Sequence, residues 1–184
     1  MSKLFLILTY YLIKNTKSQI KEIMEEEDYK FMDTEEELNG VMEYEYKNVL
    51  ECGILDYGFE IKDPEGNYTK WLMLMKAPDD SEYKGGKYLI EVEFPMDYPY
   101  KNPTFTFKPP ILYHCNVKDD GKLDVNWMMK GMKIDYIMPR LLTLFYLQDP
   151  SVDENSEISK LYESNKDEFK KNVEKNASEA KGEL

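Results

Sequence analysis

Four short apolar runs, separated by turn-forming residues, lie in the middle of this 184-residue chain and constrain its fold more than any other feature. The runs are alternating or continuously apolar, and they cover residues 58–62, 68–76, 87–94 and 104–107. Proline, glycine, aspartate and asparagine punctuate the stretches between them, at 63–67, 77–80 and 95–103. Because short strands joined by such turns pair with their chain neighbours, the pattern predicts a four-stranded antiparallel meander.

A helix is predicted ahead of these strands. Thr34 and Glu37 occupy the reciprocal positions of a capping box, and apolar residues follow at helical spacing. These signals predict a helix over 35–52 that carries Cys52 on its apolar stripe, buried as a small hydrophobic residue.

Further helices are predicted after the strands. An irregular stretch from about 108 to 133 is followed by apolar residues at helical spacing over 134–148, where Pro139 must lie in the first turn or bend the helix. Two more helices are predicted over 155–162 and 165–180, and the last is expected to be polar and exposed. The fold class is therefore α+β, with an N-terminal helix, a four-stranded meander and C-terminal helices.

The chain divides into an N-terminal extension (1–33), a folded domain (34–180) and a short C-terminal tail (181–184). The extension is first apolar and basic and then acidic, with a short polar helix predicted over 16–30. The net charge of -12, with no run rich in Lys and Arg, argues against nucleic acid as a partner, because phosphate contacts need clustered cations.

The ten residues from Leu4 to Ile13 are nearly all apolar, but a membrane-spanning helix needs roughly 20. A signal peptide would be followed by a small-residue cleavage site, and a mitochondrial targeting or anchoring segment would carry arginine; neither feature is present. A segment that docks on the domain or on a partner is the favoured interpretation. Membrane proximity through Leu4 to Ile13, with a mitochondrial or membrane-associated location, is expected ahead of the cytoplasmic alternative.

The chain has two cysteines, Cys52 and Cys115, and a single histidine, His114. Neither a disulfide framework nor a zinc site of three or four such ligands can be built from them. No metal and no cofactor are predicted.

The prolines and glycines of residues 71–103 are spaced as in the ubiquitin-conjugating enzymes, which this stretch resembles. That family has a tryptophan in the second strand, a turn P-x-D-S-x-Y-x-G-G, and a strand ending in F-P-x-D-Y-P with a further proline. The matching residues here are Trp71, Pro78, Asp80, Ser81, Tyr83, Gly85, Gly86, Phe94, Pro95, Asp97, Tyr98, Pro99 and Pro103. Residues 113–117 (YHCNV) are similar to the family's Y-H-P-N-I, and Asp149-Pro150 to its D-P after the active site. The resemblance covers about residues 38–175.

The resemblance implies a catalytic cysteine that this chain lacks. In the family a thiolate takes ubiquitin as a thioester and passes it to a lysine amine, because a thiolate is a good nucleophile and a good leaving group. Eight residues after Asn116, this chain has Asp124 within GKLDVN, where the family has G-x-I-C-L-D. An acyl anhydride on aspartate would hydrolyse, so the site is predicted to be degenerate and the chain a pseudoenzyme. The family's asparagine stabilises an oxyanion, whereas Asn116 is predicted to stabilise its own loop.

Two surfaces that the family uses for docking also differ. The W-S-P loop that contacts ligases is replaced by residues 129–133, and the first helix begins with acids where the family's tends to be basic. Of the ligase-facing residues, the loop 98–100 (YPY) is retained, and His114 is expected to serve the fold. The candidate partner-binding residues, which simple core filling could equally explain, are Tyr98, Tyr100, Trp127, Met128, Met129 and Met132.

These features predict a non-catalytic protein-interaction domain that serves as a structural or accessory subunit of a multi-subunit assembly. Retention of the last helices and of an apolar head favours this hypothesis. The alternative is a regulatory variant that pairs with an active conjugating enzyme and positions ubiquitin. A ubiquitin-transfer enzyme that uses Cys115 is a third hypothesis, disfavoured because no second histidine could act as its base.

Overall fold

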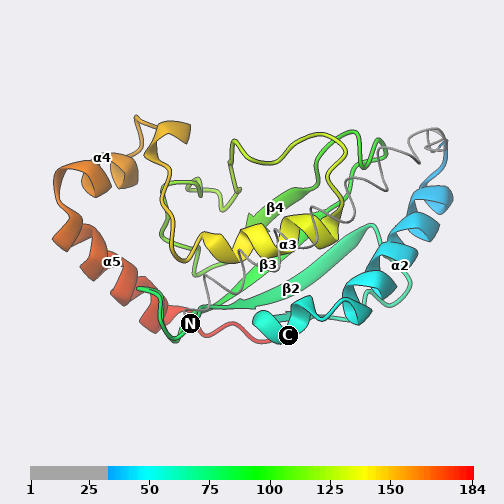
Figure 1. The fold of residues 1–184 in the computed structure, drawn as a ribbon, viewed down its shortest axis with the longest axis horizontal. Helices are drawn as coiled ribbons and strands as arrows, with labels where there is room; N and C mark the ends of the chain where they lie inside the picture. The colour runs from blue at the N-terminus through cyan, green and yellow to red at the C-terminus, as the bar shows by residue number, and fades with distance from the viewer. Residues whose placement is uncertain (1–32) are drawn as a thin grey trace.

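The computed structural model describes residues 33–184 (Figure 1). The apolar segment Leu4–Ile13 and the helix predicted over 16–30 lie outside these residues. Along the described part of the chain, one helix is followed by four strands and then by three helices. This order confirms the predicted α+β architecture.

The sheet is an antiparallel meander, as predicted. Its strands pair in chain order, and they are β1 (Phe59–Ile61), β2 (Lys70–Lys76), β3 (Lys87–Glu93) and β4 (Thr104–Phe107). The register places Met73 opposite Ile90 and Val92 opposite Phe105. Because alternate side chains of a strand point to opposite faces, one face of the sheet is uniformly apolar and buried. The side chains on this inner face include Trp71, Met73, Met75, Tyr88, Ile90, Val92, Phe105 and Phe107.

Helix α2 (Glu35–Glu51) begins at the predicted capping box. The Thr34 hydroxyl accepts a hydrogen bond from the Glu37 N–H, and the Glu37 carboxylate accepts one from the Thr34 N–H. A short 3-10 turn, η1 (Ile54–Tyr57), leads from this helix into β1. Cys52 is half-buried rather than fully buried, and its thiol donates to the Val49 carbonyl.

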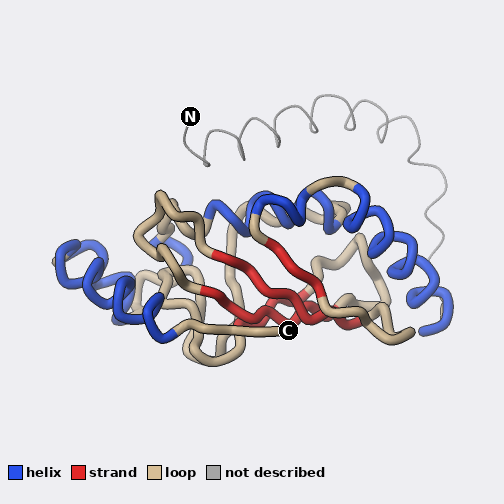
Figure 2. Tube along the Cα trace, turned by 90° about the horizontal axis from the view of Figure 1, so that it is seen from below, coloured by secondary structure: helices blue, strands red, loops and turns tan. Residues whose placement is uncertain are grey.

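Helix α3 (Ile134–Thr143) lies across the inner face of the sheet (Figure 1, Figure 2). The prediction of a helix reaching residue 148 is wrong. The N–H groups of residues 144–146 bond to carbonyls three residues before them, and the Asp149 N–H bonds to the Asn116 side chain in the loop at 114–116. Pro139 is the sixth residue of α3, beyond the first turn.

Two helices, α4 (Glu157–Ser164) and α5 (Lys166–Glu179), follow the short turn η2 (Pro150–Val152). Helix α4 starts two residues later than predicted, because the Ser156 hydroxyl caps it by accepting from the Ser159 N–H. The expectation that α5 is exposed is wrong for one of its faces. That face buries Phe169, Val173 and Ala177, and the Asn176 side chain joins it to the chain at 111–113.

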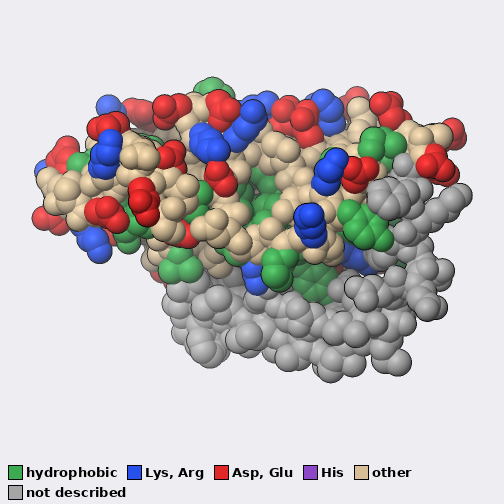
Figure 3. All heavy atoms as spheres, turned by 90° about the horizontal axis from the view of Figure 1, so that it is seen from above, with side chains coloured by type: hydrophobic (Ala, Val, Ile, Leu, Met, Phe, Trp, Pro, Cys, Tyr) green, Lys and Arg blue, Asp and Glu red, His purple; other side chains and the backbone are tan. Residues whose placement is uncertain are grey.

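The surface mixes charges of both signs. Figure 3 shows carboxylates and lysines interspersed over the face seen from above, which is not the clustered cationic surface that phosphate binding requires. No helix within 33–184 combines the length and apolar content needed to cross a membrane.

Candidate functional site

The loop at 113–117 is held against the chain that follows α3 by His114. This residue is completely buried, and its Nε2 lies 2.9 Å from the Leu147 carbonyl oxygen, to which it donates. Its Nδ1 accepts from the Asn116 N–H at 2.9 Å, so the ring is the neutral tautomer protonated on Nε2. Burial lowers the pKa of His114 from 6.5 to about 4. Both ring nitrogens are occupied, and His114 therefore serves the fold, as predicted.

Asn116 joins three segments of this site. Its Nδ2 donates to the Asp124 carbonyl at 3.2 Å, and its Oδ1 accepts from the Asp149 N–H at 3.1 Å. In return, the Asp124 N–H donates to the Asn116 carbonyl at 2.8 Å. The side chain is buried, so these bonds are shielded from water. The predicted loop-stabilising contacts of Asn116 are thus present.

Asp124 is bonded to Asn116 through its backbone, and its carboxylate pairs with Lys118. The Asp124 Oδ2 and the Lys118 Nζ are 2.8 Å apart, and both side chains are about half exposed. The carboxylate raises the pKa of the Lys118 ammonium by hydrogen bonding to its charged form. The sequence analysis did not single out Lys118, although a lysine six residues before Asp124 is a possible ion-pair partner that the sequence shows.

Cys115 is buried at the edge of the site. Its backbone N–H donates to the Gln148 Oε1 at 3.0 Å, and its thiol is hydrogen-bonded to Ser159. Burial is the main cause that raises the pKa of the thiol from 9.0 to about 11. The adjacent His114 has no nitrogen left to accept a proton from this thiol.

A groove of about 620 Å³ opens in front of these residues. Its apolar walls come from Cys115, Val117, Val152 and Ile158. Five carboxylates also line it, those of Asp119, Asp120, Asp124, Asp153 and Glu157. Lys118 also lines the groove and pairs with Asp124, so the charge of the lining is negative overall. Among residues 33–184, no group of three or more His, Cys, Asp or Glu side chains could hold a metal ion.

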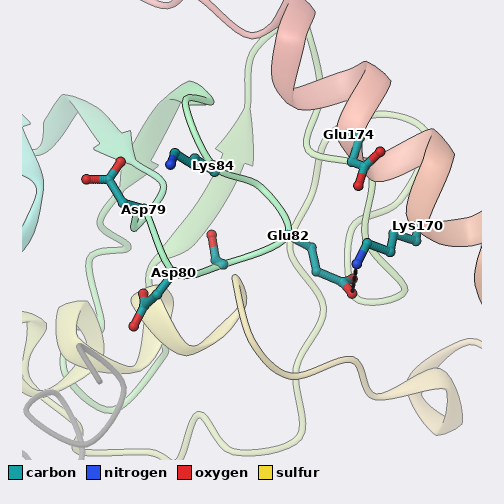
Figure 4. A pocket seen from close by; sticks show the side chains of 7 residues that line it. Asp79, Asp80, Glu82, Lys84, Lys170 and Glu174 are labelled. Carbon is teal, nitrogen blue, oxygen red and sulfur yellow. Dashed lines mark ion pairs between the residues drawn. The ribbon is translucent and has the colours of Figure 1, made fainter. Parts of the chain in front are cut away.

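A second, smaller hollow of about 470 Å³ lies between the turn at 79–84 and α5 (Figure 4). The Glu82 carboxylate and the Lys170 ammonium pair across it at 3.6 Å, whereas Asp79 and Asp80 point away from the helix. The charged side chains of this hollow are exposed to solvent, and they do not form an arrangement typical of a catalytic site.

Tyr83 and Gln148 form hydrogen bonds to the loop at 113–117, and the sequence analysis assigned them no such role. The Tyr83 hydroxyl donates to the Tyr113 carbonyl at 2.7 Å and accepts from the Gln148 Nε2 at 2.9 Å. Burial raises the pKa of Tyr83 well above its ordinary value. The detectable signal was the position of Tyr83 inside the turn motif that resembles the conjugating enzymes.

The candidate partner-binding residues lie close together but differ in exposure. Tyr98 is buried, and its hydroxyl accepts from the Ile134 N–H at 2.8 Å. Trp127, Met128 and Met132 are partly buried against the core, with the Arg140 guanidinium 5.4 Å from the Trp127 ring centre. Tyr100 is 43% exposed and Met129 is 57% exposed. Their two loops are joined by a hydrogen bond that the Gly131 N–H donates to the Pro99 carbonyl. The predicted contact surface therefore rests on Tyr100 and Met129, and we refer to it as the Tyr100–Met129 surface.

Comparison with known proteins matches residues 41–177 to a family model described as ubiquitin-conjugating enzyme. The chain is 31% identical over 115 residues to "Probable ubiquitin-conjugating enzyme E2 31" of Arabidopsis thaliana, covering 60% of this chain and 74% of that protein. It is 29% identical over 139 residues to "Ubiquitin-conjugating enzyme E2 ubc-18" of Caenorhabditis elegans, covering 72% and 88%. It is also 31% identical over 156 residues to the "Ubiquitin-conjugating enzyme E2" of African swine fever virus (strain Badajoz 1971 Vero-adapted), covering 73% and 71%.

Proposed function

This chain belongs to the ubiquitin-conjugating enzyme family, and we propose that it is a member that does not carry ubiquitin as a thioester. It acts instead as a protein-interaction subunit. Family membership points to ubiquitin, and to the proteins that deliver and use it, as the class of partner. The names of the relatives describe enzymes, so the proposal rests on what is particular to the site of this chain.

The observation that carries the proposal is the ion pair of Asp124 with Lys118 at the position where the family's motif has its nucleophile. A carboxylate paired with an ammonium is a weak nucleophile, and the anhydride that it would form with an acyl group hydrolyses in water. A thioester survives long enough to be passed on because a thiolate is a good leaving group. Asp124 cannot replace the thiol in that role.

Cys115 does not supply the missing nucleophile either. The residue is 3% exposed, the pKa of its thiol is raised to about 11, and the neighbouring imidazole is occupied on both nitrogens. The thiolate, which is the reactive form, is therefore scarce at neutral pH. These contacts support a binding role for the site over a relocated catalytic one.

Two binding roles follow from different features. The preserved frame of His114 and Asn116 and the open acidic groove support a regulatory variant that pairs with an active conjugating enzyme and positions ubiquitin. Retention of α4 and α5 and the exposed Tyr100–Met129 surface support an accessory subunit of a multi-subunit assembly. A mitochondrial or membrane-associated setting is a proposal carried by the apolar segment Leu4–Ile13 alone.

A thioester assay tests the absence of catalysis. The full chain is incubated with ubiquitin, ATP and an activating enzyme, next to an active conjugating enzyme as the positive control, and is analysed on a gel without reductant. We expect no thiol-sensitive adduct on this chain. An adduct that disappears in Cys115→Ser and persists in the matched Cys52→Ser variant would overturn the proposal.

Purification of the endogenous protein under gentle detergent extraction separates the two binding roles. A small complex with an active conjugating enzyme is expected for the regulatory variant. A large stoichiometric complex without ubiquitin-transfer proteins is expected for the accessory subunit. Recovery of the protein as a free monomer would contradict both roles.

A further inference from the structure

The C-terminal residues extend the sheet where β4 does not reach. The Lys87 N–H, at the start of β3, donates to the Ala180 carbonyl at 2.9 Å, and the Gly182 N–H donates to the Lys87 carbonyl at 3.0 Å. Lys181 therefore pairs in parallel with Lys87. On the same edge of β3, strand β4 has already ended at Phe107. Residues 180–184 thus take the position beside β3 that β4 leaves open, and we call them the strap.

The strap also packs on the outer face of the sheet, opposite to α3 (Figure 2). Leu74 and Leu89 lie on this face, because Met73, Met75 and Ile90 next to them in β2 and β3 point into the core. A Cβ atom on Gly182 would lie 3.0 Å from the Leu74 Cδ1 and 3.1 Å from the Leu89 Cγ. The strap backbone is therefore pressed against these two leucines, and Leu74 is only 2% exposed although it faces away from the core.

Few interactions hold the strap. Ala180 is buried at the end of α5, where its N–H donates to the Asn176 carbonyl. Otherwise the strap makes two backbone hydrogen bonds with Lys87 and one exposed bond from the Lys181 Nζ to the Gly85 carbonyl. Lys181, Glu183 and Leu184 are exposed, so beyond Ala180 no strap side chain is buried. By contrast, β2 and β3 are paired over seven residues each. Segments with few buried contacts open at a lower free energy than the ladder of a central sheet.

We propose that residues 180–184 form a releasable strap that opens while the domain stays folded, and that its opening exposes an apolar patch at Leu74 and Leu89. The patch is flanked on the outer face by the ion pairs Lys76–Glu60 and Lys108–Glu91, as an apolar centre with a polar rim. The strap is the built-in occupant of this patch and controls its access to solvent. This device does not depend on whether the chain carries ubiquitin.

Native-state hydrogen exchange of the full chain tests the release. We expect the amides of Lys87 and Gly182 to exchange about 100-fold faster than the protected amides of the β2–β3 ladder, as local opening requires. Exchange of these two amides at the rate of the ladder would mean that the strap opens only on global unfolding. That result would overturn the proposal.

A substitution at Gly182 tests the control of access. Valine adds a Cβ at 3.0 Å from two neighbouring atoms, and two methyl groups beyond it, so Gly182→Val is expected to displace the strap. The matched control is Glu183→Val, which places the same side chain at an exposed neighbouring position. We expect faster exchange of the Lys87 amide and stronger relaxation of the Leu74 methyl signals by a soluble paramagnetic agent in Gly182→Val only. The ladder amides report the fold in both variants, and unchanged Leu74 relaxation with a displaced strap would contradict the proposal.

Discussion

Asn116 and Asp124 bind each other through two hydrogen bonds, one donated by each residue. The Asp124 N–H donates to the Asn116 carbonyl at 2.8 Å, and the Asn116 Nδ2 donates to the Asp124 carbonyl at 3.2 Å. Asn116 therefore positions the backbone of Asp124. The side chain presented there is a carboxylate paired with Lys118.

Removal of the Asn116 side chain is expected to destabilise the domain. Asn116→Ala removes two hydrogen bonds in a partly buried site, those to the Asp149 N–H and the Asp124 carbonyl, and each such bond contributes about 0.5–1.5 kcal/mol. We expect the free energy of unfolding in urea to fall by about 1–3 kcal/mol. The matched control is Asn126→Ala, an exposed asparagine whose loss should change stability by less than about 0.5 kcal/mol. Equal effects of the two substitutions would show that Asn116 does not hold the site together.

The stability of the domain is expected to depend on pH through His114. Its pKa is lowered from 6.5 to about 4 because the neutral ring is buried. The unfolded chain thus binds a proton at a higher pH than the folded chain, so stability is full above pH 6.5 and is lost as the pH falls toward 4. The shift corresponds to about 3 kcal/mol over this window.

Urea titrations from pH 7.5 to 4.5, on the protein and on His114→Gln, isolate this contribution from that of the carboxylates. The free energy of unfolding is plotted against pH for both proteins. The difference between the two slopes is assigned to the histidine, and identical slopes would contradict the prediction. Since His114 is the only histidine, its ring proton signals in NMR report the pKa of the folded state directly.

The Cys115 thiol is expected to be unreactive in the folded protein. A pKa of about 11 in place of 9.0 reduces the thiolate fraction about 100-fold at neutral pH, and burial slows the approach of a reagent further. In a Cys52→Ser background, iodoacetamide should modify Cys115 at least about 100-fold more slowly than in the same chain unfolded in guanidinium. Equal rates in the two states would restore Cys115 as a candidate nucleophile.

Gly121 is expected to tolerate no side chain. It has φ of 84° and its carbonyl accepts from the Phe107 N–H, and an added Cβ would lie 2.2 Å from the Phe107 carbonyl oxygen. Gly121→Ala should therefore destabilise the domain by about 3 kcal/mol or more in urea unfolding. Gly131→Ala is the matched control, because Gly131 has φ of 82° but no atom within 4 Å of the added Cβ. It should lose about 1 kcal/mol from the backbone conformation alone.

Local signals in the chain predicted most of the fold. The capping box at Thr34 and Glu37 marked the first helix, and the turns between the apolar runs marked the four strands, because both are properties of neighbouring residues. The same signals failed where distant groups compete for the backbone. The helix predicted over 134–148 ends at Thr143, after which N–H groups bond three residues back, while the Leu147 carbonyl and the Asp149 N–H bond to the loop at 114–116.

The sequence by itself determined the order of the elements and the absence of a cysteine eight residues after Asn116, because both depend only on the identity and spacing of residues. The tertiary structure decided which side chains are available for chemistry or contact. It buries Tyr98 and Cys115 and leaves Tyr100 and Met129 exposed. It also pairs Asp124 with Lys118 and packs Gly182 against Leu74. These outcomes depend on contacts between segments that lie far apart in the chain, and burial sets both the pKa of a group and its access to a partner.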